Sequence, residues 1–559
     1  MSSALLYLYC LAASLVPNVA LAFTEPMSAW GGAANILLPA GLYMLLLAWS
    51  RRVGRSVWCF FPVIFFAAFQ IVLLKLYGRS VIAVDMFLNL VTTNPSEAGE
   101  LLGSLTGIVI VDVVLFVPLL VWGGIAWQRG RLLPPTFRRR AALTGCVTAA
   151  VGALCVWGAY ATPSPRYAVA DDLYPLNVAY NLVLATQRTS ALASYHTTSG
   201  SFTAHGRSER PDSLEELLIV VVGETSRAAD WQLCGYPRPT NPRLSQRRGL
   251  HAFSRALSES NTTHKAVPML LSPLDASTFG DSIDLCKGLI TPFREAGFHT
   301  SFISNQGRNH SYIDFFGEEA EEVLFLRDSL TAAQMLHPIT DLALLPHIES
   351  LLESPRARKQ LIVVHTYGSH FSYLDRYSDE CRRFTPDSYT GSSADQREAL
   401  VNAYDNSILA TDLLLDSIIS MADRRGVSAA LIYTSDHGED IFDDARGRFL
   451  HASPTPTFRQ LHVPVLVWTS EKFAALHPEL VEALEANRSR RVATSKSFYH
   501  TALQLGGVAA ATRRDSLSLA SPLFTEHPRI YLTDHNRPEP LTEAGFDPID
   551  ISLLTTLDR

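Results

Sequence analysis

The chain has 559 residues, of which 47% are hydrophobic and 18% are charged, and its formal net charge is -7. This length exceeds what one ordinary hydrophobic core holds, so at least two domains are expected. The modest negative charge argues against nucleic-acid binding, which usually requires a basic face.

The first 162 residues carry five long apolar runs that are candidate membrane spans. The runs cover approximately residues 4–23, 32–49, 57–77, 105–127 and 141–161. Each approaches the ~20 residues that a helix needs to cross a bilayer. We therefore predict a transmembrane domain of five helices over residues 1–162.

The connections between these runs differ in their basic residues. The second connection holds Arg51, Arg52 and Arg55, and the fourth holds five arginines between positions 129 and 140, whereas residues 23–29 hold no Lys or Arg. The positive-inside rule then predicts a cytoplasmic N-terminus and places everything after about residue 162 on the outer side of the membrane. Residues 20–22, "ALA", resemble a signal-peptide cleavage site, but the basic n-region is absent, and neither reading changes the orientation of the later spans.

Asp112 inside the fourth run is expected either to have a function or to pair with a neighbouring helix.

Residues 163–212 are predicted to be a linker. Its segment 173–195 has apolar residues at helical spacing, which favours a helix lying against the membrane surface, and a polar stretch follows it.

From 213 to 559, strand-like runs alternate with helical ones. The expected strands lie within 214–224, 299–307, 359–370, 427–439, 461–470 and 528–536, and the expected helices within 286–298, 341–354 and 403–426. This alternation predicts an α/β domain with a mostly parallel central sheet.

Acidic and imidazole side chains follow three of the expected strands. Glu224 comes after one strand, His365 to His370 end another, and the pair Asp436-His437 follows a third. Functional groups of such sheets collect beyond the carboxyl ends of the strands. Three other readings stay open: Glu224 could cap the next helix, Asp436-His437 could form a surface turn, and His365 could brace the fold.

Thr263 lies in "SNTTHKAVPMLLSP", where a helix N-terminus would present backbone N–H groups to an anion, although Asn261 to Thr263 also match a glycosylation sequon. Together with Glu224, Asp436 and His437 it supplies two carboxylates, a hydroxyl and an imidazole. This is a suitable tetrahedral set for Zn²⁺ in which one ligand is also a nucleophile.

With these motifs, the chain resembles the membrane-bound phosphoethanolamine transferases, a sulfatase-like branch of the alkaline phosphatase superfamily. The segments that carry the resemblance are "GETSRAADWQLCGYPRPTNP", "NTTHKAVPMLLSP", "VVHTYGSHFSYLDRY", "YDNSILATD", "TSDHGED", "FLHASPTP" and, in the membrane part, "DMFLNLVTTNPSEAGELL". The resemblance implies zinc held by Glu224, Thr263, Asp436 and His437, with Thr263 rather than Thr262 as the nucleophile. It also implies that His370 and His451 bind the phosphate-bearing substrate or a second zinc, and that Asn89 and Glu97 meet the phospholipid headgroup.

The implied reaction transfers phosphoethanolamine from phosphatidylethanolamine to an envelope acceptor, lipid A, lipopolysaccharide or a periplasmic glycan, by a monomeric enzyme. A phosphodiesterase, a glycerol-phosphate transferase of the same superfamily and a non-enzymatic membrane scaffold are the alternatives. A sulfatase is not favoured, because its C/S-x-P-x-R segment is absent around Thr263.

The seven cysteines predict little covalent bracing. Cys234, Cys286 and Cys381 lie after the apolar runs with no C-x-x-C spacing, so one disulfide is possible and a multi-bridge framework is not. Some members of the family have a disulfide flanking the nucleophile segment, where this chain has Ser260 and Met269.

Overall fold

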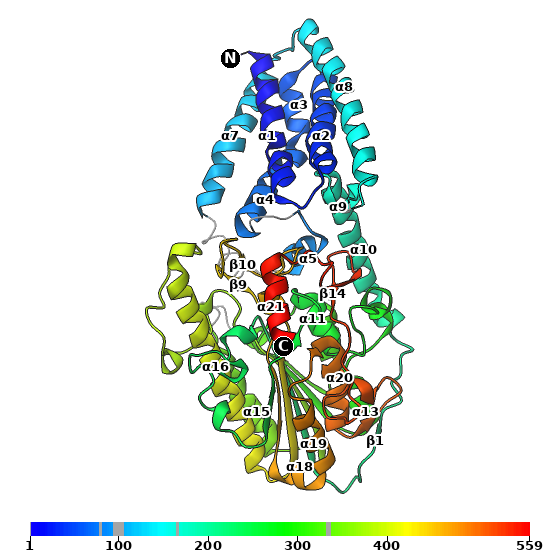
Figure 1. The fold of residues 1–559 in the computed structure, drawn as a ribbon, viewed down its shortest axis with the longest axis vertical. Helices are drawn as coiled ribbons and strands as arrows, with labels where there is room; N and C mark the ends of the chain where they lie inside the picture. Colours follow the sequence, from blue (N-terminus) through cyan, green and yellow to red (C-terminus); the bar gives the residue numbers. More distant parts are fainter. Residues whose placement is uncertain (1, 78–80, 93–105, 164–166, 331–336, 559) are drawn as a thin grey trace. The chain divides into compact units, whose positions relative to one another are not determined.

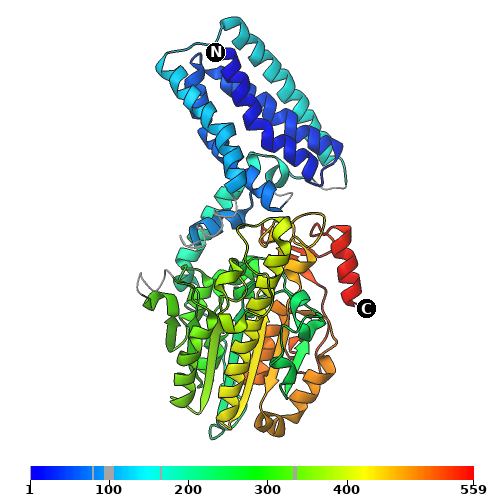
Figure 2. The same cartoon turned by 90° about the vertical axis from the view of Figure 1, so that its left-hand side faces the viewer.

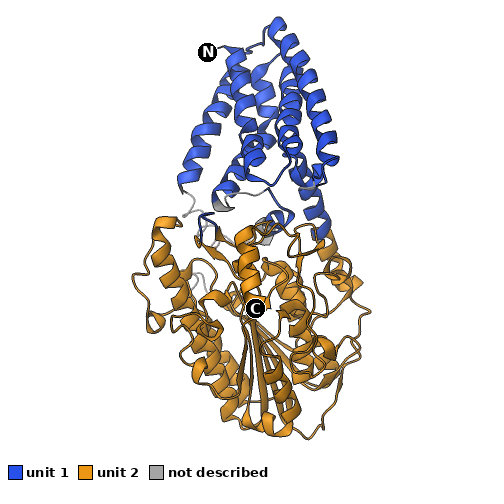
Figure 3. Cartoon of the chain, viewed as in Figure 1, with its two compact units in different colours: residues 1–91, 95–188, 444–448 blue, residues 92–94, 189–443, 449–559 orange. Residues whose placement is uncertain are grey.

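The computed structural model describes residues 2–77, 81–92, 106–163, 167–330 and 337–558. Two compact units are distinguished in Figure 3: unit 1 holds residues 1–91, 95–188 and 444–448, and unit 2 holds residues 92–94, 189–443 and 449–559. The domain boundaries expected at 162 and 212 stay predictions.

Unit 1 is helical (Figure 1). Its described helices are α1 (Ser3–Thr24), α2 (Ala29–Trp49), α3 (Val53–Cys59), α4 (Phe61–Tyr77), α5 (Val84–Thr92), α7 (Thr106–Gln128), α8 (Pro135–Tyr160), α9 (Val169–Asp172) and most of α10 (Leu176–Thr198). Among the described residues, α1, α2, α7 and α8 are long and apolar enough to cross a membrane, and α3 with α4 make a fifth span if the bent pair counts as one. The expected helical membrane part is therefore confirmed, with four to five spans.

The third apolar run differs from the single helix expected over 57–77. It begins earlier, at Val53, and breaks near Phe60 into α3 and α4, which meet at an angle of 53°. Pro62 in the first turn of α4 explains the break, because its ring has no N–H and clashes with the carbonyl four residues earlier.

The two arginine-rich connections lie side by side. Arg52 forms an isolated antiparallel bridge with Leu132, and the Leu133 amide donates to the carbonyl of Arg51 over 2.9 Å. The α2–α3 and α7–α8 connections therefore belong to the same end of the helical unit, as the positive-inside argument requires of both.

Helix α10 (Leu176–Thr198) begins in unit 1 and ends in unit 2. Tyr195 near its end is buried, stacks on Phe315 at 5.0 Å between ring centroids, and donates its hydroxyl to the carbonyl of Cys286 over 3.0 Å. The end of the predicted surface helix thus contributes to the core of unit 2.

Unit 2 is built on a seven-stranded sheet in the order β3-β11-β8-β2-β7-β5-β6. The strands are β2 (Glu216–Gly223), β3 (Leu250–Phe253), β5 (His299–Ser304), β6 (Glu322–Phe325), β7 (Lys359–His365), β8 (Ser428–Ser435) and β11 (Val465–Thr469). The five strands β8, β2, β7, β5 and β6 are parallel to one another in this order. Strand β11 is antiparallel to both of its neighbours, β8 and β3. The predicted mostly parallel α/β sheet is confirmed.

Helices cover both faces of this sheet, so its central strands are apolar throughout. Alternate residues of β2 enter different cores: Leu218, Val220 and Val222 pack on one side, and Leu217, Ile219 and Val221 on the other. The first side is covered by α11 (Thr263–Leu270), α13 (Ile290–Glu295), α14 (Tyr312–Gly317), α19 (Pro478–Asn487) and α20 (Thr494–Leu505), and the second by α15 (Leu345–Glu353) and α16 (Arg397–Arg424). Figure 2 shows the long α16, in yellow, running along the sheet.

The remaining elements of unit 2 are short. They are α12 (Phe279–Ser282), α17 (Phe458–Leu461), α18 (Glu471–Leu476), α21 (Pro548–Asp558) and the strand pairs β1–β13 (Arg207–Ser208, Val508–Ala509), β4–β12 (Ala256–Leu257, Val492–Ala493), β9–β10 (Asp440–Ile441, Phe449–Leu450) and β14–β15 (Ile530–Leu532, Pro538–Pro540).

Three local expectations for unit 2 need correction. The strand expected at 528–536 is β14, which pairs only with β15 and is outside the central sheet. The helix expected at 286–298 shortens to α13, and the segment 341–354 divides into a 3-10 turn and α15.

All seven cysteines are free, so the single disulfide that the sequence allowed does not form.

Candidate functional site

Three neighbouring strands bring the predicted groups to one edge of the sheet. In the register of the parallel pairs β2–β8 and β2–β7, Gly223 lies opposite Ser435 and Val222 opposite His365. Glu224 and Asp436 each follow the last residue of their strand. They therefore emerge next to each other at the carboxyl edge, as the sequence predicted.

The fourth group comes from a helix. Thr263 is the first residue of α11, and Thr262 is its N-cap. The Thr263 Oγ1 lies 3.0 Å from Glu224 Oε1 and 3.1 Å from His437 Nε2, although 39 and 174 residues separate the partners along the chain. The structure thus brings together all four residues proposed as metal ligands.

The separations between these atoms suit a tetrahedral cation site. His437 Nε2 lies 3.5 Å from Glu224 Oε1 and 3.3 Å from Asp436 Oδ2. Tetrahedral Zn²⁺ with bonds of about 2.0–2.1 Å would hold its ligand atoms about 3.3–3.4 Å apart. The Oδ2 of Asp436 is buried and has no hydrogen-bond partner among the described residues, which leaves it available to a cation. The residues present therefore fit a zinc ion.

Neighbouring backbone groups orient the ligands. The His437 Nδ1 lies 3.0 Å from the carbonyl oxygen of Gly438. Because a carbonyl only accepts, Nδ1 carries the proton and Nε2 presents its lone pair to Thr263. The other oxygen of Asp436, Oδ1, accepts from the amides of Thr225 at 3.0 Å and His437 at 2.7 Å, which fixes the carboxylate.

This environment decides against two alternative readings of the motifs. Glu224 is only 2% exposed, and it is not the N-cap of the 3-10 helix that follows: Arg227 holds that position, with no side-chain cap hydrogen bond. Asp436 and His437 are fully buried, so they do not form a surface turn.

Burial dominates the electrostatics of the site. It raises the pKa of Glu224 to about 7, with a further rise from Asp436, and it raises the pKa of Asp436 to about 7 as well. Burial also lowers the pKa of His437, which keeps the imidazole neutral. Two adjacent buried carboxyl groups and a neutral imidazole lack positive charge, and a divalent cation would supply it.

His451 and His370 lie beside this cluster. The His451 ring centroid is 4.3 Å from that of His437 and 5.6 Å from that of His370. Ligand atoms of Glu224, His437 and His451 all lie within 4.8 Å of one another, so His451 could also take part in holding a metal. Burial, together with His437 and His370, lowers the pKa of His451 well below its ordinary value.

The backbone around these groups adopts conformations that ordinary residues rarely occupy. Positive φ angles occur at Thr225 (58°), next to Glu224, and at Leu450 (66°) and Ala452 (62°), which flank His451. Gly368 has φ 56°, and a Cβ there would lie 2.3 Å from the carbonyl oxygen of Glu224. Such strain concentrates at functional sites, where the surrounding fold must hold it in place.

Two residues near the site escaped the sequence analysis. The Gln306 Nε2 lies 3.3 Å from Glu224 Oε2 and donates to the carbonyl of Thr366 over 2.9 Å. Glu439 is fully buried, neither of its carboxyl oxygens has a hydrogen-bond partner among the described residues, and its Oε2 lies 3.5 Å from His451 Nδ1. Their positions in the sequence could have identified both residues, because Gln306 follows the end of strand β5 and Glu439 follows the end of strand β8.

The remaining predicted residues divide into two groups. His365 is buried at the end of β7, where its Nδ1 lies 3.3 Å from Ser304 Oγ and burial lowers its pKa to about 4, in keeping with a bracing role. The side chain of Asn89 and the whole of Glu97 lie outside the described residues.

Sequence comparison identifies the family. The family model described as Sulfatase matches residues 216–508, just over half of the chain. The chain therefore belongs to the sulfatase family, and the matched region contains all the candidate residues of unit 2.

The relatives within that family are more specific. Phosphoethanolamine transferase EptA of Escherichia coli (strain K12) is 29% identical over 301 residues, which cover 53% of this chain and 54% of the relative. The chain thus spans about half the length of the curated relatives it matches, and the resemblance to phosphoethanolamine transferases is confirmed over that part.

Two solved structures show the same architecture. The integral membrane protein lipooligosaccharide phosphoethanolamine transferase A (EptA) from Neisseria meningitidis aligns with a TM-score of 0.70 at 23% identity, over 93% of this chain and 98% of its own. The C-terminal periplasmic domain of EcEptC from Escherichia coli, in complex with Zn, aligns with a TM-score of 0.54 at 25% identity, over 61% of this chain and 96% of its own. The first likeness extends the common fold to the helical part.

Proposed function

We propose that this chain transfers phosphoethanolamine from phosphatidylethanolamine to an acceptor in the cell envelope, through a covalent intermediate on Thr263. The observation that carries the proposal is the position of the Thr263 hydroxyl, 3.0 Å from a buried carboxylate and 3.1 Å from a neutral imidazole. The relatives are named phosphoethanolamine transferases, which supports phosphoethanolamine as the transferred group. The name of the Neisseria meningitidis protein includes lipooligosaccharide, which supports a lipooligosaccharide-like acceptor.

Zinc is the proposed cofactor, held by Glu224, Thr263, Asp436 and His437. The donor set, the unpartnered oxygen of Asp436 and the zinc complex of the EcEptC domain support it. A bound divalent cation would lower the pKa of the threonine hydroxyl and offset negative charge on the transferring phosphoryl oxygens.

The reaction is two displacements. In the first, Thr263 Oγ1 loses its hydroxyl proton and bonds to the phosphorus of phosphatidylethanolamine, the bond from phosphorus to the diacylglycerol oxygen breaks, and that oxygen takes up a proton. In the second, an acceptor oxygen displaces Thr263, loses its proton, and the threonine hydroxyl is restored. Glu224 and His437 hold Thr263 Oγ1 in place for both steps, since each contacts it directly.

His370 and His451 are the proposed substrate-binding residues. Burial lowers the pKa of His451, so its imidazole is neutral near pH 7. A neutral imidazole can accept a proton from an acceptor hydroxyl. Its ring contacts those of His437 and His370, which supports a role for both histidines next to the leaving and entering oxygens.

The proposed setting is an inner membrane with the catalytic unit in the periplasm. The apolar helices of unit 1 support it, because a diacyl donor resides in the bilayer. Asn89 and Glu97 remain proposed headgroup contacts. The proposed enzyme acts as a monomer and binds no nucleic acid.

Labelled phosphatidylethanolamine tests transfer against hydrolysis. The full-length protein is incubated with membranes that contain the acceptor lipids and with donor labelled in its ethanolamine. We expect most of the released label to appear on a glycolipid or glycan. Label recovered only as free phosphoethanolamine would replace the transferase with a phosphodiesterase.

Metal content tests the ligand set. Purified full-length protein is expected to contain bound zinc by elemental mass spectrometry, and Asp436→Asn should weaken zinc affinity by more than about 10-fold. Asp416→Asn is the matched control, because Asp416 pairs with Arg247 away from the site. Equal zinc affinity of the wild type and both variants, measured by competition with a chelator, would exclude Asp436 as a ligand.

A further inference from the structure

A groove in unit 1 lies outside everything that the proposed transfer uses. Its volume is about 660 Å³, and it lies between the end of α2 and the bent pair α3–α4. The lining residues are Leu46, Trp49, Ser50, Arg55, Ser56, Cys59, Phe60 and Val63.

The helix geometry explains why the groove exists. Helix α3 packs closely on α7 through Gly54, where a Cβ would lie 2.3 Å from the amide nitrogen of Trp127. This close packing draws α3 toward α7, and the 53° bend at Phe60 then turns α4 away from the α3 axis. The opposite face of α3 therefore leaves space against α2 that no side chain fills.

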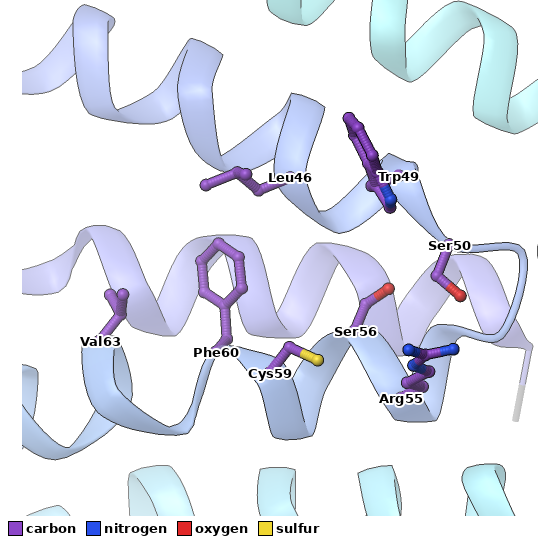
Figure 4. A pocket seen from close by; sticks show the side chains of 8 residues that line it. All are labelled: Leu46, Trp49, Ser50, Arg55, Ser56, Cys59, Phe60 and Val63. Atoms are coloured by element: carbon purple, nitrogen blue, oxygen red, sulfur yellow. The ribbon is translucent and has the colours of Figure 1, made fainter.

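The groove is polar at one end and apolar at the other (Figure 4). Ser50, Arg55 and Ser56 lie at the end near the α2–α3 connection, and Leu46, Phe60 and Val63 lie at the far end. Trp49, 86% exposed, lies between them on the α2 side. The lining thus matches a molecule with a polar head and an apolar tail.

The polar end has unused hydrogen-bonding capacity. The guanidinium of Arg55 makes no hydrogen bond or ion pair among the described residues. Ser56 is 4% exposed, and its buried Oγ has no hydrogen-bond partner there either. A guanidinium matches phosphate oxygens in geometry and charge, and a buried hydroxyl without a partner carries a free-energy cost that a ligand oxygen would remove.

We propose that this groove binds an anionic phospholipid, with the phosphate against Arg55 and Ser56 and one acyl chain along Leu46, Phe60 and Val63. The arginines of the α2–α3 and α7–α8 connections cluster at the same end of unit 1 and add to the attraction for an anionic headgroup. The occupant is a lipid rather than a soluble phosphate, because Leu46, Phe60 and Val63 complement an acyl chain and a soluble phosphate has no apolar part to contact them. This site is separate from the proposed donor site and does not depend on the transferase proposal.

Cys59 makes the proposal testable, since its thiol lines the groove and is exposed. Cys146 on α8 is also exposed and does not line the groove, so it is an internal control. Full-length protein in detergent is treated with N-ethylmaleimide, with added phosphatidylglycerol, phosphatidylcholine or glycerol 3-phosphate, and the modification of each cysteine is followed by peptide mass spectrometry. Phosphatidylglycerol is expected to slow modification of Cys59 by about five-fold or more and to leave Cys146 unchanged.

The variant Arg55→Ala should abolish this protection, and the control Arg424→Ala, which removes an arginine that is 64% exposed in unit 2, should retain it. Equal protection of Cys59 by phosphatidylcholine would mean an unspecific lipid layer and overturn the proposal. Protection by glycerol 3-phosphate alone would identify a soluble anion instead of a lipid. Protection that survives Arg55→Ala would remove the assigned phosphate contact.

Discussion

Replacing Thr263 with alanine is expected to lower the rate of phosphoethanolamine transfer by at least about 10⁴-fold, because no other side chain supplies the oxygen that bonds to phosphorus. The hydroxyl contacts groups of the candidate metal site, Glu224 and His437, and Thr263 is the first residue of α11 but not its N-cap, so the fold should persist. The measurement is the initial rate of label transfer from phosphatidylethanolamine, together with the mass of the peptide that contains Thr263. The wild-type peptide should gain one phosphoethanolamine during turnover, and the variant peptide should not.

Thr262→Ala is the matched control for this prediction. Thr262 precedes the nucleophile directly, and its Oγ1 contacts Ser260 Oγ at 3.1 Å rather than the metal-ligand cluster. It makes no side-chain cap on α11, so its loss should change the rate less than about 3-fold. Normal transfer by Thr263→Ala, or phosphoethanolamine on Thr262, would refute the assignment of the nucleophile.

The edge of the sheet that carries the site was predictable because strands leave a simple pattern. The residues of β2 and β8 are buried along their whole length, which gives mainly apolar runs in the sequence, and the first charged residues after these strands are Glu224 and Asp436. Parallel neighbours end at the same edge, so polar residues at the ends of the runs meet in space.

Other features of the site were not predictable from local pattern. Thr263 and His451 come from a short helix and from a hairpin with strained residues, and a threonine or histidine in such segments carries no periodic signal. The expected helix N-terminus pointed to the segment of Thr263, but only the resemblance to a family chose Thr263 over Thr262 and singled out His451. The break at Phe60 depends on one proline, and the groove beside it depends on the close approach of Gly54 to α7, which involves residues about 70 positions apart.

The second large effect expected concerns stability rather than chemistry. Arg227 is 2% exposed, and its guanidinium pairs with Asp230 and with Asp443, the latter over 2.6 Å. It also donates to the carbonyl of Glu439 over 3.2 Å and lies over the ring of Tyr404 at 5.3 Å. Arg227→Met would leave two buried carboxylates without their main partner, which costs about 3–5 kcal/mol of unfolding free energy at pH 7. Hydrogen exchange of β2 and β8 peptides in the full-length protein would measure it.

Arg424→Met is the control, because Arg424 is 64% exposed and lies 3.6 Å from the half-exposed Glu349, an arrangement worth about 0–1 kcal/mol.

The pH dependence gives a second criterion. Burial alone would raise the pKa of Asp443, but Arg227 and Arg459 outweigh it and hold that pKa below its ordinary value. A depressed carboxyl pKa stabilises the fold above the unfolded-state pKa of about 4, and this stabilisation is lost as the pH falls below that value. The difference between wild type and Arg227→Met should therefore shrink as the pH falls from about 6 toward 3. A difference below about 1 kcal/mol at pH 7, or one that grows on acidification, would show that Arg227 does not hold these carboxylates in the fold.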